Sequence, residues 1–151
     1  MDKILDTERP YLRKIRQADF SALCEIFQNE AVMYAWEHAF TTGEVEAWIA
    51  EGIMRYGRDG FSYWAVIEKT ANELIGVAGI ILEEVEGENH IGIGYIFNKS
   101  HWHKGYAFEA ASACVHYAFD TLGLDTITAQ IRPWLLYTSA AAHEEDRVGI
   151  R

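Results

Sequence analysis

A short loop between a strand-like segment and a helix-like segment holds the residues best suited to chemistry. His103, Lys104 and Gly105 follow residues 91–97, which have strand character, and precede an alanine-rich segment with helical spacing. The first turn of a helix has N–H groups without an intrahelical acceptor, and the helix dipole favours negative charge there. Gly105 lets the backbone come close to an anion, and the two basic side chains add positive charge. The pattern predicts an anion site with a pyrophosphate as its ligand.

The spacing differs from two better-known phosphate loops. No G-x-x-x-x-G-K-[ST] run occurs, and Gly92 and Gly94 lie inside the strand, where they do not form a dinucleotide fingerprint. A strand, a loop with one glycine and a helix is also a common junction that binds nothing. On the loop alone, both interpretations stay open.

Composition limits the function classes. A chain of 151 residues that is 50% hydrophobic forms one domain with its own core. A net charge of −10 argues against a nucleic-acid partner and favours a cationic one, although acidic surfaces also serve solubility. Without a signal peptide or an apolar run of eighteen residues, the expected location is cytoplasmic, away from membranes. Cys24 and Cys114 fit buried free thiols, and no Cys/His spacing indicates a metal site.

Hydrophobic periodicity and turn residues predict a strand, two helices, three strands, a helix and a strand, in that order. Thr41 and Glu44 form a capping box for the second helix, and Gly123 suits a left-handed end to the third. Neighbouring strands with short turns should pair antiparallel, and the last two should lie parallel across their helix. The strands are expected at residues 9–16, 61–68, 74–83, 90–97 and 126–131, and the helices at 18–30, from 41 to the break at 58–60, and 105–122.

The loop sequence Trp102-His103-Lys104-Gly105-Tyr106-Ala107, followed by Glu109-Ala110, resembles the acyl-CoA pyrophosphate loop of the GNAT superfamily of N-acetyltransferases. It is most similar to the branch that includes the ribosomal-protein N-terminal acetyltransferases. The resemblance continues over residues 9–133, from Leu12-Arg13 in the first strand to Gln130-Ile131 in the last. It implies an α+β fold of three layers, with a mixed, mostly antiparallel sheet flanked by helices.

The resemblance also implies an activity. Acetyl-CoA would be the co-substrate, and its acetyl group would pass directly to a primary amine, on a small molecule or a protein N-terminus. A homodimer is compatible with this assignment. The expected cofactor-binding residues are Tyr95, Ile96, Phe97, His103, Lys104, Gly105, Tyr106 and Ala107, and the acceptor-pocket candidates are Glu37 and His38.

No catalytic base follows from the sequence. Gly92 stands where similar family members often carry a glutamate, so the resemblance supports no carboxylate base on that strand, and Glu37 and His38 are the alternatives. A catalytically inactive acyl-CoA-binding module is one alternative function, and a small interaction domain whose loop binds nothing is another.

The resemblance stops after residue 133. The family continues with an Asn-containing turn, a helix and two strands, whereas residues 134–151 form an atypical C-terminal tail. Trp134 to Ser139 resembles translated adapter sequence, and the competing interpretation is a natural variant in which Ser139 caps a last helix. We therefore expect an incomplete GNAT-like domain at 1–133, truncated after the fifth strand and impaired in turnover.

Overall fold

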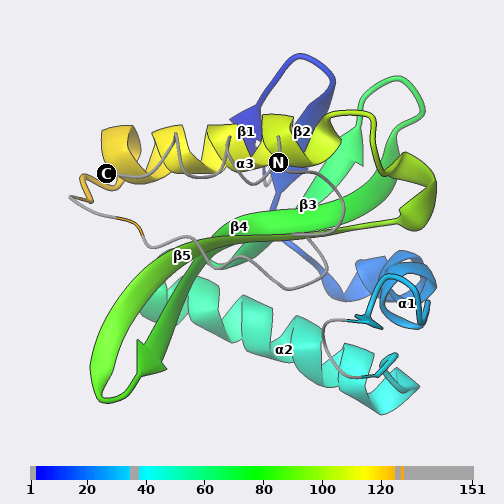
Figure 1. The fold of residues 1–151 in the computed structure, drawn as a ribbon, viewed down its shortest axis with the longest axis horizontal. Coiled ribbons are helices and arrows are strands. Elements are labelled where there is room, and N and C mark those ends of the chain that lie inside the picture. Colours follow the sequence, from blue (N-terminus) through cyan, green and yellow to red (C-terminus); the bar gives the residue numbers. More distant parts are fainter. Residues whose placement is uncertain (1–2, 35–37, 125–126, 128–151) are drawn as a thin grey trace.

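The computed structural model describes residues 3–34, 38–124 and 127. Within them, one antiparallel sheet has its strands in chain order, flanked by helices on both faces (Figure 1). Helices α1 and α2 cover one face and α3 covers the other, which confirms the predicted three-layer α+β architecture. The strands are β1 (Lys3–Asp6), β2 (Pro10–Arg13), β3 (Tyr63–Glu68), β4 (Glu73–Val85) and β5 (Glu88–Phe97), and the helices are α1 (Phe20–Phe27), α2 (Thr42–Asp59) and α3 (Tyr106–His116).

The N-terminal part of the sheet differs from the prediction. A single strand was expected at residues 9–16, but β1 and β2 form a hairpin in which Asp6 pairs with Tyr11. Strand β1 has only two apolar residues, Ile4 and Leu5, which pack at the margin of the core, so no sequence period marks it. The predicted fifth strand at 126–131 and the tail at 134–151 lie outside the described residues, apart from Ile127, which is buried in the core.

The central hairpins follow the alternation expected of a sheet buried on both faces. Along β3, the side chains of Trp64 and Val66 point toward α3, whereas those of Ala65 and Ile67 point toward α1 and α2. The tight turn between β4 and β5 has Glu86 and Gly87 at φ 53° and 82°, the left-handed pair that joins two strands in a two-residue hairpin.

The helix boundaries follow the predicted caps. The Thr41 hydroxyl accepts from the Glu44 N–H at 3.2 Å and the Glu44 carboxylate accepts from the Thr41 N–H at 2.8 Å, which confirms the capping box of α2. Gly60, at φ 87°, ends that helix. Helix α3 continues through a π turn, Tyr117–Thr121, and Gly123 follows at φ 71°. Both cysteines are free thiols, and Cys114 is buried whereas Cys24 is half-buried.

A buried ion pair joins β2 to the start of α1. Both Arg13 guanidinium Nη atoms donate to the Asp19 carboxylate, at 2.8 and 2.9 Å, and the Arg16 N–H donates to the same carboxylate at 2.9 Å. Burial alone would raise the pKa of Asp19, but these donors hold it below its ordinary value. The pair therefore stabilises the fold only while Asp19 is ionised.

We predict that Asp19→Asn lowers the free energy of unfolding at pH 7 by about 3 kcal/mol, because Arg13 keeps a buried charge without its partner. Since the pKa of Asp19 is depressed in the folded state, its contribution is complete above the unfolded pKa of about 3.9 and is lost as pH falls below it. Urea unfolding of both proteins at pH 7 and at successively lower pH measures the difference, which should shrink in acid.

Asp6→Asn is the matched control, because Asp6 pairs with Lys3 and Lys69 at an exposed position. Its loss of stability should be much smaller, since exposed pairs contribute little. Equal losses in the two variants would contradict a special role for the buried pair.

Candidate functional site

The loop between β5 and α3 is anchored to the end of the strand. After Phe97 the chain makes a short 3-10 turn, Lys99–His101, in which the Asn98 side chain accepts from the Ser100 N–H at 3.0 Å. The Trp102 indole N–H then donates to the Phe97 carbonyl at 2.9 Å. The side chain of Trp102 therefore holds the loop against the end of β5, just before the chain enters α3.

Gly105 is the residue at which α3 begins. It has φ 86° and is followed directly by the right-handed Tyr106. A change of backbone hand between successive residues is typical of anion-binding concavities lined by N–H groups. Gly105, the N-cap residue, has no side chain to cap this end of the helix, and the Glu109 N–H makes the first intrahelical bond, to the Gly105 carbonyl at 3.0 Å. The N–H groups of the preceding turn are thus placed for a ligand.

The turn between β1 and β2 holds this loop from the other side. Arg9 donates through Nε to Glu109 at 2.8 Å and through Nη1 to the Lys104 carbonyl at 2.8 Å, and its guanidinium lies 4.3 Å from the centre of the Tyr106 ring. The Arg9 N–H, at 2.9 Å, and the Thr7 hydroxyl, at 2.8 Å, also donate to the Glu109 carboxylate. One side chain, Arg9, therefore fixes the residues before and after Gly105.

Glu109 stays ionised in this network. Its side chain is only 19% exposed, and burial alone would raise its pKa. The donors from Arg9 and Thr7 outweigh that effect and lower the pKa of Glu109 below its ordinary value. Sequence reasoning did not find Thr7 or Arg9, because neither lies near the loop in the chain.

The predicted cofactor-binding residues of the loop lie next to one another, but their side chains differ in solvent exposure. His103, at φ 63°, and Lys104 are exposed beside Gly105, whereas Tyr106 and Ala107 are half-buried against the core. Lys104 and His103 can therefore meet a ligand with their side-chain nitrogens, while Tyr106 lies under Arg9.

The predicted strand residues lie on β5, the outermost strand of the described sheet. The Asn98 N–H donates inward to the Ile75 carbonyl of β4 at 2.9 Å, whereas the Phe97 carbonyl accepts from outside the strand pair. Backbone groups alternate in direction along an antiparallel strand, so those of Tyr95 point outward with Phe97, and those of Ile96 point toward β4.

The predicted acceptor residues are not among the residues of the pocket described below. Glu37 lies outside the described residues. The His38 Nε2 lies 3.0 Å from the Glu44 carboxylate, the group that caps α2, and its ring lies 6.0 Å from that of Phe40. The His38 side chain therefore contacts the first turn of α2.

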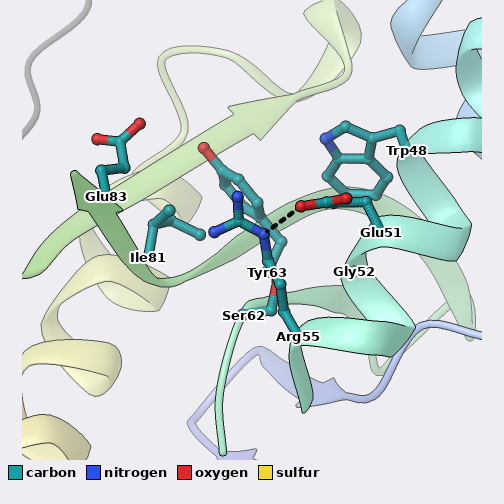
Figure 2. Close-up of a pocket in the computed structure, with 8 residues that line it drawn as sticks. All are labelled: Trp48, Glu51, Gly52, Arg55, Ser62, Tyr63, Ile81 and Glu83. Carbon is teal, nitrogen blue, oxygen red and sulfur yellow. Dashed lines mark hydrogen bonds and ion pairs between the residues drawn. The ribbon is translucent and has the colours of Figure 1, made fainter. Parts of the chain in front are cut away.

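A pocket of about 200 Å³ opens between α2 and the sheet (Figure 2). Arg55 crosses it, donating through Nε to Glu51 at 3.0 Å and through Nη1 to the Leu82 carbonyl at 3.1 Å. The sequence did not single out this pocket, since its residues come from three separate segments. Its lining consists of Trp48, Glu51, Gly52, Arg55, Ser62, Tyr63, Ile81 and Glu83.

The described part of the chain has neither a metal-binding cluster nor a membrane-spanning helix. No group of three or more His, Cys, Asp or Glu side chains in that part of the chain could hold a metal ion. No helix among the same residues is long and apolar enough to cross a membrane.

Comparisons with known proteins agree with this geometry. A family model described as the acetyltransferase (GNAT) domain matches residues 9–135. A Bacillus licheniformis protein named uncharacterized N-acetyltransferase p20 is 30% identical over 131 residues, which are 85% of this chain and 73% of that protein.

Solved structures show the same fold. A GNAT-family acetyltransferase from Bacillus anthracis has a TM-score of 0.74 and 29% identity, and the match covers 93% of this chain and 80% of that one. RimL, a ribosomal L7/L12 alpha-N-protein acetyltransferase solved in complex with coenzyme A, shares the fold at a TM-score of 0.75 and 17% identity, over 97% of this chain and 82% of that one. The family match, over most of the chain, shows that this protein belongs to the GNAT acetyltransferases.

Proposed function

We propose that this protein is an acetyl-CoA-dependent N-acetyltransferase that moves an acetyl group directly to a primary amine. The observation that carries the proposal is the start of α3, where left-handed Gly105 has no side chain to cap the first backbone N–H groups and Arg9 holds the loop in place. A pyrophosphate matches such a site in charge and in hydrogen-bond demand. Family membership and the coenzyme A complex of RimL support this choice of co-substrate.

The remaining loop and strand residues would hold the other parts of acetyl-CoA. His103 and Lys104 are exposed beside Gly105 and would meet the phosphates with their side chains. The outward-facing backbone of β5 near Tyr95 and Phe97 would bind the amides of the pantetheine arm, with Ile96 between them. Such an arrangement places the thioester beside the outer strand.

Acetyl-CoA would supply an activated acetyl thioester. The acceptor nitrogen must be neutral to attack its carbonyl carbon; the C–N bond forms as the C–S bond breaks, the amine proton passes to a base or to water, and the departing thiolate takes up a proton. Holding the two substrates together provides much of the rate enhancement. No covalent enzyme intermediate is needed for this transfer.

Glu37 and His38 remain our candidates for contact with the acceptor, whether that is a small amine or a protein N-terminus. The 3.0 Å contact between His38 Nε2 and the Glu44 carboxylate holds His38 at the start of α2, the helix that also lines the pocket. We therefore expect His38→Gln to change the rate of turnover and to leave the affinity for acetyl-CoA unchanged.

Acetyl-CoA titration followed by a thiol-release assay on a panel of amines tests the function. Binding with turnover supports the acetyltransferase. Binding without turnover on any amine would contradict it in favour of an inactive acyl-CoA-binding module, and absence of binding would contradict both.

We predict that Gly105→Ala weakens acetyl-CoA binding at least tenfold, about 1.4 kcal/mol. The added methyl group would lie 3.1 Å from the Arg9 guanidinium and would crowd the approach of a phosphate to the backbone. Calorimetric titration measures the affinity, and thermal unfolding measures the stability.

Gly60→Ala is the matched control. Gly60 follows the C-terminal end of α2 with nearly the same backbone angle, φ 87°, and an added methyl group there would meet open space. Both variants should lose about 1–2 kcal/mol of stability from a left-handed alanine. Only Gly105→Ala should lose affinity for acetyl-CoA, and equal affinities would show that the loop does not hold the phosphates.

Arg9→Lys tests whether Arg9 positions the loop. Lysine keeps the positive charge, but it lacks the planar guanidinium group that donates to both the Glu109 carboxylate and the Lys104 carbonyl. We therefore expect about tenfold weaker acetyl-CoA binding and a small change of melting temperature. Arg58→Lys, at an ion pair with Asp59 on the end of α2, is the control and should bind normally. Unchanged affinity in Arg9→Lys would mean that only the charge of Arg9 matters.

A further inference from the structure

The pocket between α2 and the sheet has an apolar wall. The rings of Trp48 and Tyr63 lie 5.5 Å apart between their centroids, and Ile81 of β4 continues the surface (Figure 2). A chain of methylene groups would pack against these three side chains, and aromatic faces also attract cations. The wall therefore suits the hydrocarbon part of an amine.

The charged groups of the pocket leave one carboxylate uncompensated. Arg55 is paired with Glu51 and also donates to the Leu82 carbonyl, so these two charges balance. Glu83 has no ion-pair partner among the described residues; the residue opposite it on β5, His90, lies 3.7 Å from Glu88. The pocket as a whole favours one positive charge.

Glycines lie between this pocket and the outer edge of the sheet. Ile81 pairs with Gly92 across the two strands, and Gly79 pairs with Gly94, so the face of β5 beside the pocket has no side chain at either position. A methyl group on Gly94 would lie 2.5 Å from the Tyr63 hydroxyl, so glycine is what allows the Tyr63 ring to reach over β5. The Tyr63 ring covers Gly94, which is buried like Gly92, so an acceptor arm that lies on this ring would pass over β5 toward the edge.

Strand spacing separates Glu83 from the reacting atoms. Neighbouring strands lie about 4.8 Å apart, so a pantetheine arm beyond β5 would be about two spacings, roughly 10 Å, from the backbone of β4. An ammonium group held by Glu83 is therefore not the nitrogen that attacks the thioester.

We infer that the acceptor is a diamine: one ammonium group pairs with Glu83, the methylene chain lies on Trp48, Tyr63 and Ile81, and the other amine reaches the thioester. The inference rests on the proposed function and specifies its substrate class. The net charge of −10 would attract such a dication.

Cadaverine and pentylamine, which have the same length and differ by one amine, test the inference in the thiol-release assay. The KM for cadaverine should be at least about tenfold lower than that for pentylamine, since a charge-assisted hydrogen bond is added. Glu83→Gln should raise the KM for cadaverine to the pentylamine value and leave pentylamine kinetics and acetyl-CoA affinity unchanged.

Glu84→Gln removes the same charge from the next residue of β4, which is exposed and points to the other face of the sheet, so the preference for cadaverine should persist. Equal KM values for the two amines in the wild-type protein would overturn the inference and leave the proposed function standing. Equal loss of preference in both variants would also overturn it, because general charge would then be the cause.

If the protein turns over no amine, the result counts against the proposed function. Binding of the amine to the pocket can then be measured without turnover. Calorimetric titration of the full chain with cadaverine should show binding that Glu83→Gln abolishes and Glu84→Gln retains. Absence of binding, or binding that survives in Glu83→Gln, would overturn the inference.

Discussion

The carboxylate of Glu109 is the point on which the candidate anion site depends. It accepts hydrogen bonds from Thr7 and from Arg9, which lies 100 residues earlier in the chain, and so it joins the first hairpin to the first turn of α3. Because the same Arg9 side chain also holds the Lys104 carbonyl, the loop is fixed on both sides of Gly105. Backbone N–H groups bind an anion well only when their direction is fixed before the ligand arrives.

The two proposed substrates carry opposite charges, and the sheet keeps their sites apart. The acyl carrier is a polyanion and would approach the loop at the start of α3, where the helix dipole and Lys104 offset the acidic character of the chain. The amine would approach from the face covered by α2, where Glu83 adds a negative charge. The β5 strand lies between these regions, and Gly94 makes room for the Tyr63 ring on its α2 face.

Much of the fold follows from local sequence. The capping box of Thr41 and Glu44, the three central strands and the glycine that starts α3 each have a signal within a few residues, and the structure confirms them. Strand β1 could not be predicted, because Lys3–Asp6 is too short and too polar to show a period and forms only by pairing with β2. The predicted strand at 126–131 lies outside the described residues, so it stays a prediction.

The sequence by itself determined where α3 begins and so predicted where an anion would bind, in the loop of His103, Lys104 and Gly105, because a helix start and its glycine are encoded in consecutive residues. Tertiary structure alone decided what holds that loop and where an amine would lie. The contacts of Arg9 with Glu109, and the pocket that brings Trp48 together with Glu83, join segments that are far apart in the chain. Such contacts have no local period, since they depend on how strands and helices pack against one another.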